Sequence, residues 1–460
     1  MTEILSGKLE ECDQLIERAR KSLESRQFED AESNTNIASS RVKQEIEKIQ
    51  KKVEKIDTSS EKSMGNIAAK LQELDSRQKT IILLQETIKK EKDRAKNYRL
   101  LVEEIGKADI VGQISTARKM IEQALSRSRT LKPQDRYFLF LRRWNSFTPL
   151  LSETGEVKQG GGYFFVWDGT GIVIDPGIGF LQNLLSFGYS ICDIDSIVLT
   201  HSHVDHTADL EAILTVLHEL NSARIADHVD PHLISVYANI GVANKFMQLM
   251  SLSFDNISKL VVLSPSTQYD ITSQISINTH PGFHKDLYAS KASCLGLAFT
   301  CSSEDKKVRF GITSDTGFSS DLSKAFSEMK DSMLILHIGS VLEEELDLGM
   351  QSDRIYEQHL GLKGTYNMIY EIRPKVAIIS EIGEEMKDTI LPIVEKLQKI
   401  FPSISTLPSD IGLKIDFSSF GVPFKVECQR CKGLSDASTV AFGYSPEKKS
   451  IEFLCSNCKA

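Results

Sequence analysis

The strongest chemical signal in this sequence is a group of three histidines and one aspartate directly after an apolar segment. Residues 197–200 have the composition of a buried strand and lead into His201-Ser-His203-Val-Asp205-His206. A tight loop after a strand can direct His201 and His203 at one metal ion, and Asp205 and His206 at a second. Imidazole nitrogens with one carboxylate favour Zn²⁺, ahead of Mn²⁺ and iron. Packing in the core is a reasonable explanation for one buried histidine. It is a poor explanation for three histidines and one aspartate at this spacing.

A second set of metal-binding side chains lies near the end of the chain. Cys428-Gln-Arg-Cys431 and Cys455-Ser-Asn-Cys458 form two C-x₂-C pairs separated by 23 residues. Each pair can supply two thiolates to a tetrahedral Zn²⁺, and the intervening residues 441–454 are long enough for a β-hairpin. The pattern resembles a zinc ribbon and predicts one structural Zn²⁺. Disulfides or a redox pair are the alternatives.

Composition sets the broad class of the protein. The chain has 460 residues, 41% hydrophobic and 26% charged, with a net charge of −8. These values predict a globular protein of about two to four domains and argue against a disordered chain or a globally basic nucleic-acid coat protein. The sequence shows neither a secretory signal nor an apolar run of membrane-spanning length. The expected location is therefore the reducing cytoplasm, without a membrane.

The elements that must position these groups fall into three predicted regions. Residues 1–135 are rich in helix formers, contain no proline before Pro133, and predict antiparallel helices or a coiled-coil hairpin, with a further helix over 111–127. Residues 136–422 alternate strand and helix patterns, which predicts an α/β domain. Residues 423–460 are too few to form a core alone and need the zinc. The helical region is expected to dimerise or bind a protein partner; the alternative is a bundle packed on its own catalytic domain.

The histidine motif, preceded by Ile174-Asp175-Pro-Gly, resembles the metallo-β-lactamase superfamily, and within it the ribonuclease Z and phosphodiesterase branch. The resemblance covers about residues 137–420 and implies a four-layer αββα sandwich with two metal ions, Zn²⁺ or Mn²⁺. It implies further ligands downstream, and the matching positions are His284 for the third histidine of the first metal, Asp315 for the bridging carboxylate and His359 for the last ligand. His280 is the alternative to His284. Asp175 is expected to orient a ligand histidine. His337 ends an apolar strand, and the two interpretations are a packing residue or a residue that lies just behind the ligands.

The resemblance also implies a reaction. Two metal ions bridged by Asp315 would lower the pKa of a shared water, and the resulting hydroxide would attack the substrate. Asp205, as a ligand of the second metal, would position this nucleophile and is the predicted catalytic residue. The leading hypothesis is a phosphodiesterase or nuclease acting on RNA, DNA or nucleotides. The alternatives are a carbonyl hydrolase for a thioester, lactone or amide, and an interaction protein with a vestigial metal site.

Overall fold

The computed structural model divides into two compact units, residues 1–121 and 122–460. It describes residues 2–54, 61–108, 110–125, 128–143, 145, 160–252, 255–289, 294–304, 306–346, 356–419 and 424–459. The three-region division at residues 135 and 422 stays a prediction. Among the described residues, no helix is both long enough and apolar enough to cross a membrane.

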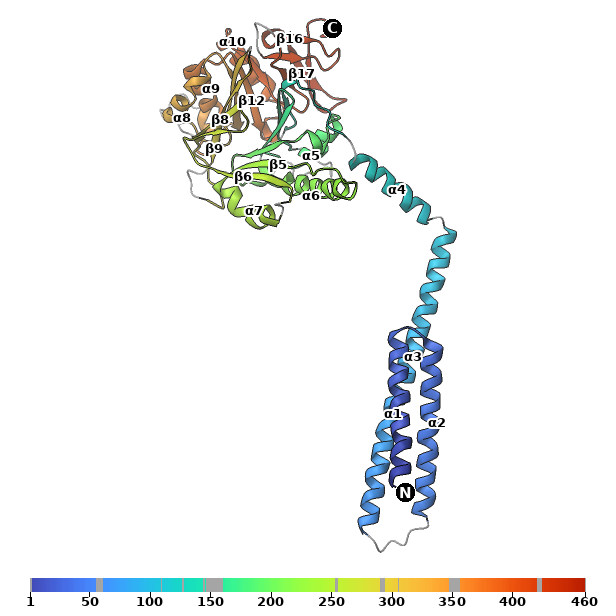
Figure 1. Cartoon of the computed structure of the whole chain (residues 1–460). Coiled ribbons are helices and arrows are strands. Elements are labelled where there is room, and N and C mark those ends of the chain that lie inside the picture. The colour runs from blue at the N-terminus through green and yellow to red at the C-terminus, as the bar shows by residue number, and fades with distance from the viewer. Residues whose placement is uncertain are drawn as a thin grey trace. The chain divides into compact units, whose positions relative to one another are not determined.

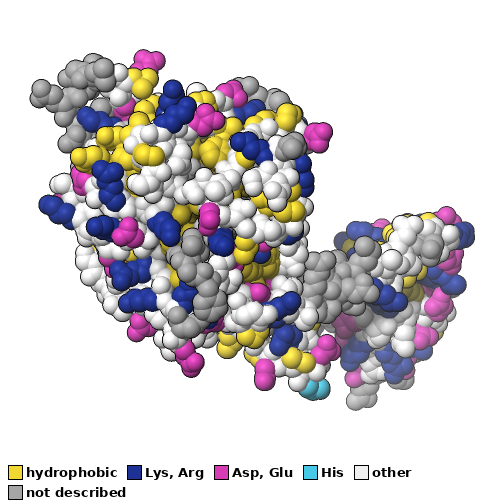
Figure 2. Space-filling model, turned by 90° about the horizontal axis from the view of Figure 1, so that it is seen from above, with side chains coloured by type: hydrophobic (Ala, Val, Ile, Leu, Met, Phe, Trp, Pro, Cys, Tyr) yellow, Lys and Arg dark blue, Asp and Glu magenta, His cyan; other side chains and the backbone are white. Residues whose placement is uncertain are grey.

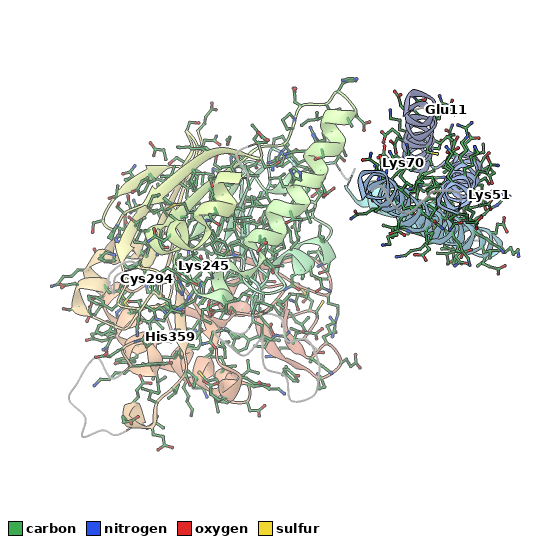
Figure 3. All side chains as sticks on the ribbon, turned by 90° about the horizontal axis from the view of Figure 1, so that it is seen from below. Glu11, Lys51, Lys70, Lys245, Cys294 and His359 are labelled. Atoms are coloured by element: carbon green, nitrogen blue, oxygen red, sulfur yellow. The ribbon has the colours of Figure 1, made fainter. Side chains whose placement is uncertain are left out.

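The first unit is a bundle of three helices, α1 (Thr2–Glu24), α2 (Phe28–Val53) and α3 (Glu61–Lys107). Seen nearly end-on in Figure 3, the three form a triangle that carries Glu11, Lys51 and Lys70 on separate helices. The predicted hairpin of two helices therefore lacks one helix of the observed bundle, because α1 packs against both α2 and α3. The helix predicted over 111–127 is α4 (Ile110–Leu125), and residues 126 and 127 lie outside the described residues.

Apolar side chains at helical spacing form the core of this bundle. The core residues come from all three helices and include Cys12, Leu15, Ala38, Val42, Ile49, Leu74 and Ile81. Ion pairs between helices flank this core: Arg77 binds Asp13 at 2.7 Å, and Lys92 binds Glu32 at 2.6 Å. The 3–4 spacing thus buries one stripe of each helix and leaves charged side chains on the outside.

We expect this helical unit to carry a dimer contact, because Tyr98, Leu101 and Val102 of α3 are between 48% and 68% exposed. Light scattering should give a mass above one chain for the full-length protein and one chain for a protein that begins at Ser128. This starting point keeps Arg129 in its ion pair with Asp195. Identical one-chain masses for both proteins would contradict the dimer.

The second unit contains two large sheets that face each other. The first has the order β16-β15-β14-β1-β2-β3-β4-β5-β6, and the second has the order β13-β12-β11-β10-β9-β8-β7. Strands of the first sheet are β1 (Arg136–Phe140), β2 (Tyr163–Trp167), β3 (Thr170–Ile174), β4 (Ser196–Leu199), β5 (Ile234–Asn239), β6 (Ile257–Leu263), β14 (Lys414–Asp416), β15 (Lys425–Glu427) and β16 (Leu434–Asp436). Strands of the second are β7 (Gln268–Asp270), β8 (Ile275–Pro281), β9 (Leu295–Ser302), β10 (Lys307–Ile312), β11 (Met333–Gly339), β12 (Val376–Ile382) and β13 (Ser405–Pro408).

Helices cover the outer face of each sheet, as Figure 1 shows. On the first sheet lie α5 (Phe180–Ser186), α6 (Val204–Ala226) and α7 (Ile240–Leu252); on the second lie α8 (Ser320–Ala325), α9 (Gly361–Ile372) and α10 (Ile390–Ile400). Aromatic residues fill the space between the sheets; Phe165 and Phe310 are fully buried with ring centroids 4.8 Å apart. The arrangement confirms the predicted four-layer αββα sandwich.

Parallel pairing brings the functional segments to one edge of this sandwich. β3, β4 and β5 are parallel neighbours in the first sheet, and β10, β11 and β12 are parallel neighbours in the second. Carboxyl ends of parallel strands meet at the same sheet edge, which is where α/β proteins place their ligands. The segments after β4 and β10 hold the candidate ligands His201 and Asp315, and the segment after β3 holds Asp175, which is expected to orient a ligand histidine.

The C-terminal tail is part of this unit's core as well as a cysteine site. Its strands β15 and β16 extend the first sheet, and the predicted hairpin is present as β17 (Ala441–Ser445) paired with β18 (Ser450–Leu454). Val426 and Phe453 are fully buried in the main core. The tail therefore draws on the sandwich for apolar burial, in addition to the metal that the sequence predicts.

Candidate metal centre

The histidine motif occupies the connection between β4 and α6. His201 follows the strand, His203 immediately precedes the helix, and Asp205 and His206 lie in its first turn. A carboxylate in the first turn of a helix is stabilised by the helix dipole. Gly177 makes room for this turn, since a Cβ atom at that position would lie 1.8 Å from the carbonyl oxygen of Asp205.

Asp175 holds the motif from the neighbouring strand. One of its carboxylate oxygens accepts from the backbone N–H of Thr200 at 2.8 Å, and the other accepts from the Thr200 hydroxyl at 2.6 Å. The second oxygen also lies 2.9 Å from Nδ1 of His206. Because the carboxylate accepts, Nδ1 of His206 carries a proton, and Nε2 is the nitrogen that faces the centre.

Four of the predicted first-metal ligands come together. Ligand atoms of His201, His203, His284 and Asp315 all lie within 4.8 Å of one another. The Asp315 oxygen Oδ2 is 3.7 Å from Nε2 of His201 and 3.8 Å from Nε2 of His284. Three imidazoles and one carboxylate at this separation match the donor set that Zn²⁺ takes in catalytic sites.

Hydrogen bonds on the outer side of two of these rings orient their lone pairs inward. Nδ1 of His284 lies 2.7 Å from the carbonyl oxygen of Gln358, which can only accept. Nδ1 of His201 lies 3.1 Å from the Thr200 hydroxyl, whose own hydrogen goes to Asp175. In both rings Nε2 is therefore unprotonated, and Nε2 of His201 is buried without a hydrogen-bond partner. Such a nitrogen is expected to bind a metal ion, so the residues fit one.

The second predicted set is assembled differently. Asp205 and His206 converge within 4.8 Å with Glu381 of β12. The guanidinium of Arg142, which follows β1, lies among them: its Nη2 is 3.2 Å from Oδ2 of Asp205 and 3.2 Å from Nε2 of His206, and its Nε pairs with Glu381. Burial alone would lower the pKa of Arg142, but the carboxylates of Glu381 and Asp205 raise it, so the group stays charged.

His337 lies directly behind Asp315. Its Nδ1 is 3.0 Å from Oδ1 of Asp315, and its Nε2 is 2.9 Å from the hydroxyl of Tyr163. Burial lowers the pKa of His337 to about 4, so the ring is neutral and donates from Nδ1. This hydrogen bond leaves Oδ2 of Asp315 to face the histidines.

The remaining predicted histidines separate clearly. Nδ1 of His359 is buried without a hydrogen-bond partner and lies 3.8 Å from Oδ2 of Asp315. Gly339 accommodates this ring, since its φ is +71° and a Cβ atom there would lie 2.5 Å from Cγ of His359. His280 lies outside the described ligand groups; its Nε2 is 3.8 Å from Glu328 and its ring packs on Phe326. The structure thus brings His284, and not His280, to the centre.

Two charged residues that the sequence did not single out for a role hold the motif loop. Asp286 accepts from the backbone N–H of Ser202 at 3.1 Å and also pairs with the Ser202 hydroxyl. Lys245 of α7, labelled in Figure 3, donates to the carbonyl oxygen of Ser202 at 2.7 Å and to Thr207 at 2.9 Å. Burial lowers the pKa of Lys245. These contacts fix the segment between His201 and His203.

The four cysteines of the tail form a second, closed group. Sulfur atoms of Cys428, Cys431, Cys455 and Cys458 lie within 4.8 Å of one another, and all four cysteines are free. Although burial alone would raise the pKa of Cys428, backbone N–H groups of Cys431, Cys455 and Arg430 lower it to about 6, which favours the thiolate. This arrangement has the donor set of a structural zinc site.

Arg142 and Glu381 are the members of the site that the sequence did not reveal. Glu381 belongs to a strand whose apolar run was visible, and a carboxylate at the carboxyl end of a buried parallel strand is a usable signal. Its φ of +57°, unusual outside glycine, also marks a constrained position. Arg142 carries no comparable signal, because it lies 59 residues before His201 and belongs to no recognisable spacing.

Parts of this chain are similar in sequence to known proteins. Residues 170–380 match the family model of the beta-lactamase superfamily domain. Ribonuclease Z from Streptomyces coelicolor is 35% identical over 71 residues, which are 15% of this chain and 23% of that protein. Ribonuclease Z from Salinispora arenicola is 31% identical over 113 residues, 24% of this chain and 34% of that protein. The chain thus spans only 23% and 34% of the length of these two relatives.

Solved structures resemble the second unit at low sequence identity. The metallo-beta-lactamase fold protein YhfI from Bacillus subtilis has a TM-score of 0.44 and 14% identity, covering 60% of this chain and 98% of that one. The short form of human tRNase Z has a TM-score of 0.42 and 14% identity, covering 61% and 98%. The family match and the layer order given above agree: residues 170–380 are similar to the beta-lactamase superfamily domain, and the unit that contains them has the four-layer αββα order of a metallo-β-lactamase sandwich.

Proposed function

We propose that this protein is a metal-dependent hydrolase that cleaves phosphodiester bonds in RNA, DNA or nucleotides. The observation that carries the proposal is the convergence of His201, His203, His284 and Asp315 within 4.8 Å. A complete set of ligands with inward lone pairs also argues against a vestigial site. The local similarity to ribonuclease Z proteins supports phosphodiesters over thioesters, lactones and amides as substrates.

Each group at the centre has a definable task in such a reaction. A divalent ion at the four ligands would lower the pKa of a water and polarise a phosphoryl oxygen. The histidines keep their lone pairs on the ion because Gln358 and Thr200 accept their other protons. Asp205, on the helix side, accepts hydrogen bonds and positions the attacking water. The family resemblance implies a second ion, which Asp205, His206, His359 and Asp315 would hold and which would add positive charge beside the substrate.

A nucleic-acid substrate does not require a uniformly basic protein. The face of the molecule in Figure 2 carries Lys, Arg, Asp and Glu side chains interspersed. We therefore expect binding to depend on contacts near the centre more than on a broad positive surface.

In the direct test, zinc-replete full-length protein is incubated with three classes of substrate. These are phosphodiesters (bis-p-nitrophenyl phosphate and labelled RNA), a panel of thioesters and a panel of lactones. We expect cleavage of the phosphodiesters, loss of cleavage with a chelator, and recovery on adding back Zn²⁺ or Mn²⁺. Chelation removes the ion that activates the water, so the loss should be nearly complete. Absence of cleavage of every phosphodiester by the metal-replete protein would refute the proposal, and thioester or lactone cleavage alone would replace it with a carbonyl hydrolase.

A further inference from the structure

Arg142 is a fully buried arginine at the place where a second metal ion would bind. It follows β1 of the first sheet, whereas Asp205 and His206 come from α6 and Glu381 from β12. Its Nη2 lies 3.2 Å from both Oδ2 of Asp205 and Nε2 of His206. These are two of the atoms that a second ion would use.

The chemistry of the contacts leaves little room for that ion. A guanidinium offers five N–H donors and no acceptor. Nδ1 of His206 already binds Asp175, so Nε2 is the only ring nitrogen left for an ion, and Nη2 of Arg142 lies 3.2 Å from it. An imidazole nitrogen with one lone pair serves either a hydrogen-bond donor or a metal ion. As long as Nη2 stays here, His206 cannot be a ligand.

A second carboxylate holds the arginine in this position. Nε of Arg142 pairs with Glu381, whose side chain is fully buried and whose backbone has a φ of +57°. The guanidinium is thus bound at Nε by Glu381 and at Nη2 by Asp205. Removing one partner of a buried ion pair is strongly destabilising, so displacing Arg142 by a metal ion would leave Glu381 without its partner.

The charge at the centre is consistent with one metal ion. Three buried carboxylates face it, from Asp205, Asp315 and Glu381. Burial raises the pKa of Glu381 well above its ordinary value, so one divalent cation together with the guanidinium of Arg142 already balances or exceeds the negative charge of these groups. The fourth carboxylate, Asp175, is turned away into its own hydrogen bonds with Thr200 and His206. Two divalent ions in addition to Arg142 would leave a net positive centre in a buried environment, which is costly.

We propose that Arg142 takes the place of the second metal ion, so that this site works with one divalent ion and one fixed guanidinium. The inference rests on the metal-dependent part of the proposed function. His201, His203, His284 and Asp315 hold the ion, while Asp205, His206 and Glu381 hold the arginine. Arg142 is then a positioning residue that supplies fixed positive charge beside the ion, where two-metal enzymes use a second cation.

Metal counting tests this arrangement without reference to activity. Full-length protein is saturated with Zn²⁺, dialysed against metal-free buffer, and analysed for zinc per chain. We expect two ions in the wild type, one at the histidine centre and one at the cysteines. Arg142→Ala should bind three, because it frees Asp205 and His206, whereas Arg142→Lys should stay at two. Arg309→Ala, which removes an arginine from β10, is the matched control and should also stay at two.

A second readout keeps the test decisive if Arg142→Ala fails to fold. Mn²⁺-loaded wild type should give the electron paramagnetic resonance spectrum of isolated ions, without spin coupling between neighbours. Three zinc ions per wild-type chain, or a spin-coupled manganese pair, would overturn the inference, as would folded Arg142→Ala that still binds two. An active wild type with three ions would refute only the role of Arg142, and an inactive wild type with two ions would refute only the phosphodiesterase.

Discussion

Replacing His201 with alanine should lower phosphodiester cleavage by about a thousandfold, which corresponds to roughly 4 kcal/mol of transition-state stabilisation. His201 is fully buried, and among the described residues its Nε2 has no hydrogen-bond partner. Without that ligand the first metal site keeps His203, His284 and Asp315 but loses affinity. We expect steady-state rates and zinc content to fall together, while circular dichroism stays that of the folded protein.

The control residue for this experiment lies on α6, the helix that follows the histidine motif. His218 of α6 is exposed and is not among the described ligand groups, so His218→Ala should keep full activity and zinc. Asp205→Ala should abolish cleavage as well, but with the first metal retained, since Asp205 lies outside that ligand group. A His201→Ala protein that binds one zinc fewer and still cleaves phosphodiesters at the wild-type rate would remove the metal from the mechanism.

The second large effect concerns the tail. Cys428→Ser combined with Cys455→Ser should lower bound zinc by one ion per chain and leave the histidine centre loaded. A structural zinc contributes folding free energy directly, on the order of 10 kcal/mol in small zinc domains. Val426 and Phe453 of the tail are also buried in the core of the sandwich. We therefore expect the melting temperature of the whole unit to fall, and we do not expect the tail to unfold separately.

Cys192→Ser provides the matched control for the tail. This cysteine is buried in the same unit but lies outside the cysteine group, so its replacement should not change the zinc count. Metal analysis and calorimetry on the same samples separate the two effects. An unchanged zinc total in the double variant would eliminate the zinc ribbon.

The sequence predicted the parts of this molecule that depend on local pattern. Apolar runs followed by loops predicted the strands and the place of the histidine motif. The paired cysteines predicted the second candidate metal group. The choice of His284 over His280 came from a family resemblance, and the structure shows its physical basis: His280 is the penultimate residue of β8, while His284 follows it in the loop that reaches the centre.

Other features depend on contacts between distant segments and left no local trace. The helix that the hairpin prediction missed is α1, whose core stripe is made of Cys12, Leu15 and Ala19 and gives only a weak apolar pattern along the sequence. The contacts of Arg142 form only when β1, α6 and β12 pack together. A buried arginine between two carboxylates cannot be foreseen from spacing, because its partners lie 63 and 239 residues further along the chain.

The two candidate metal groups are linked through two neighbouring residues of the chain, Arg142 and Arg143. Arg142 points to the histidine centre, and its neighbour Arg143 points the other way, to Asp410 at 2.6 Å and to the carbonyl oxygen of Lys449 in the tail at 2.6 Å. Asp410 in turn accepts from the backbone N–H of Ile451 at 2.7 Å. Assembly of the cysteine-rich tail therefore helps to lock the segment that carries Arg142. Loosening the tail would therefore also loosen the backbone segment that places Arg142 beside Asp205 and His206.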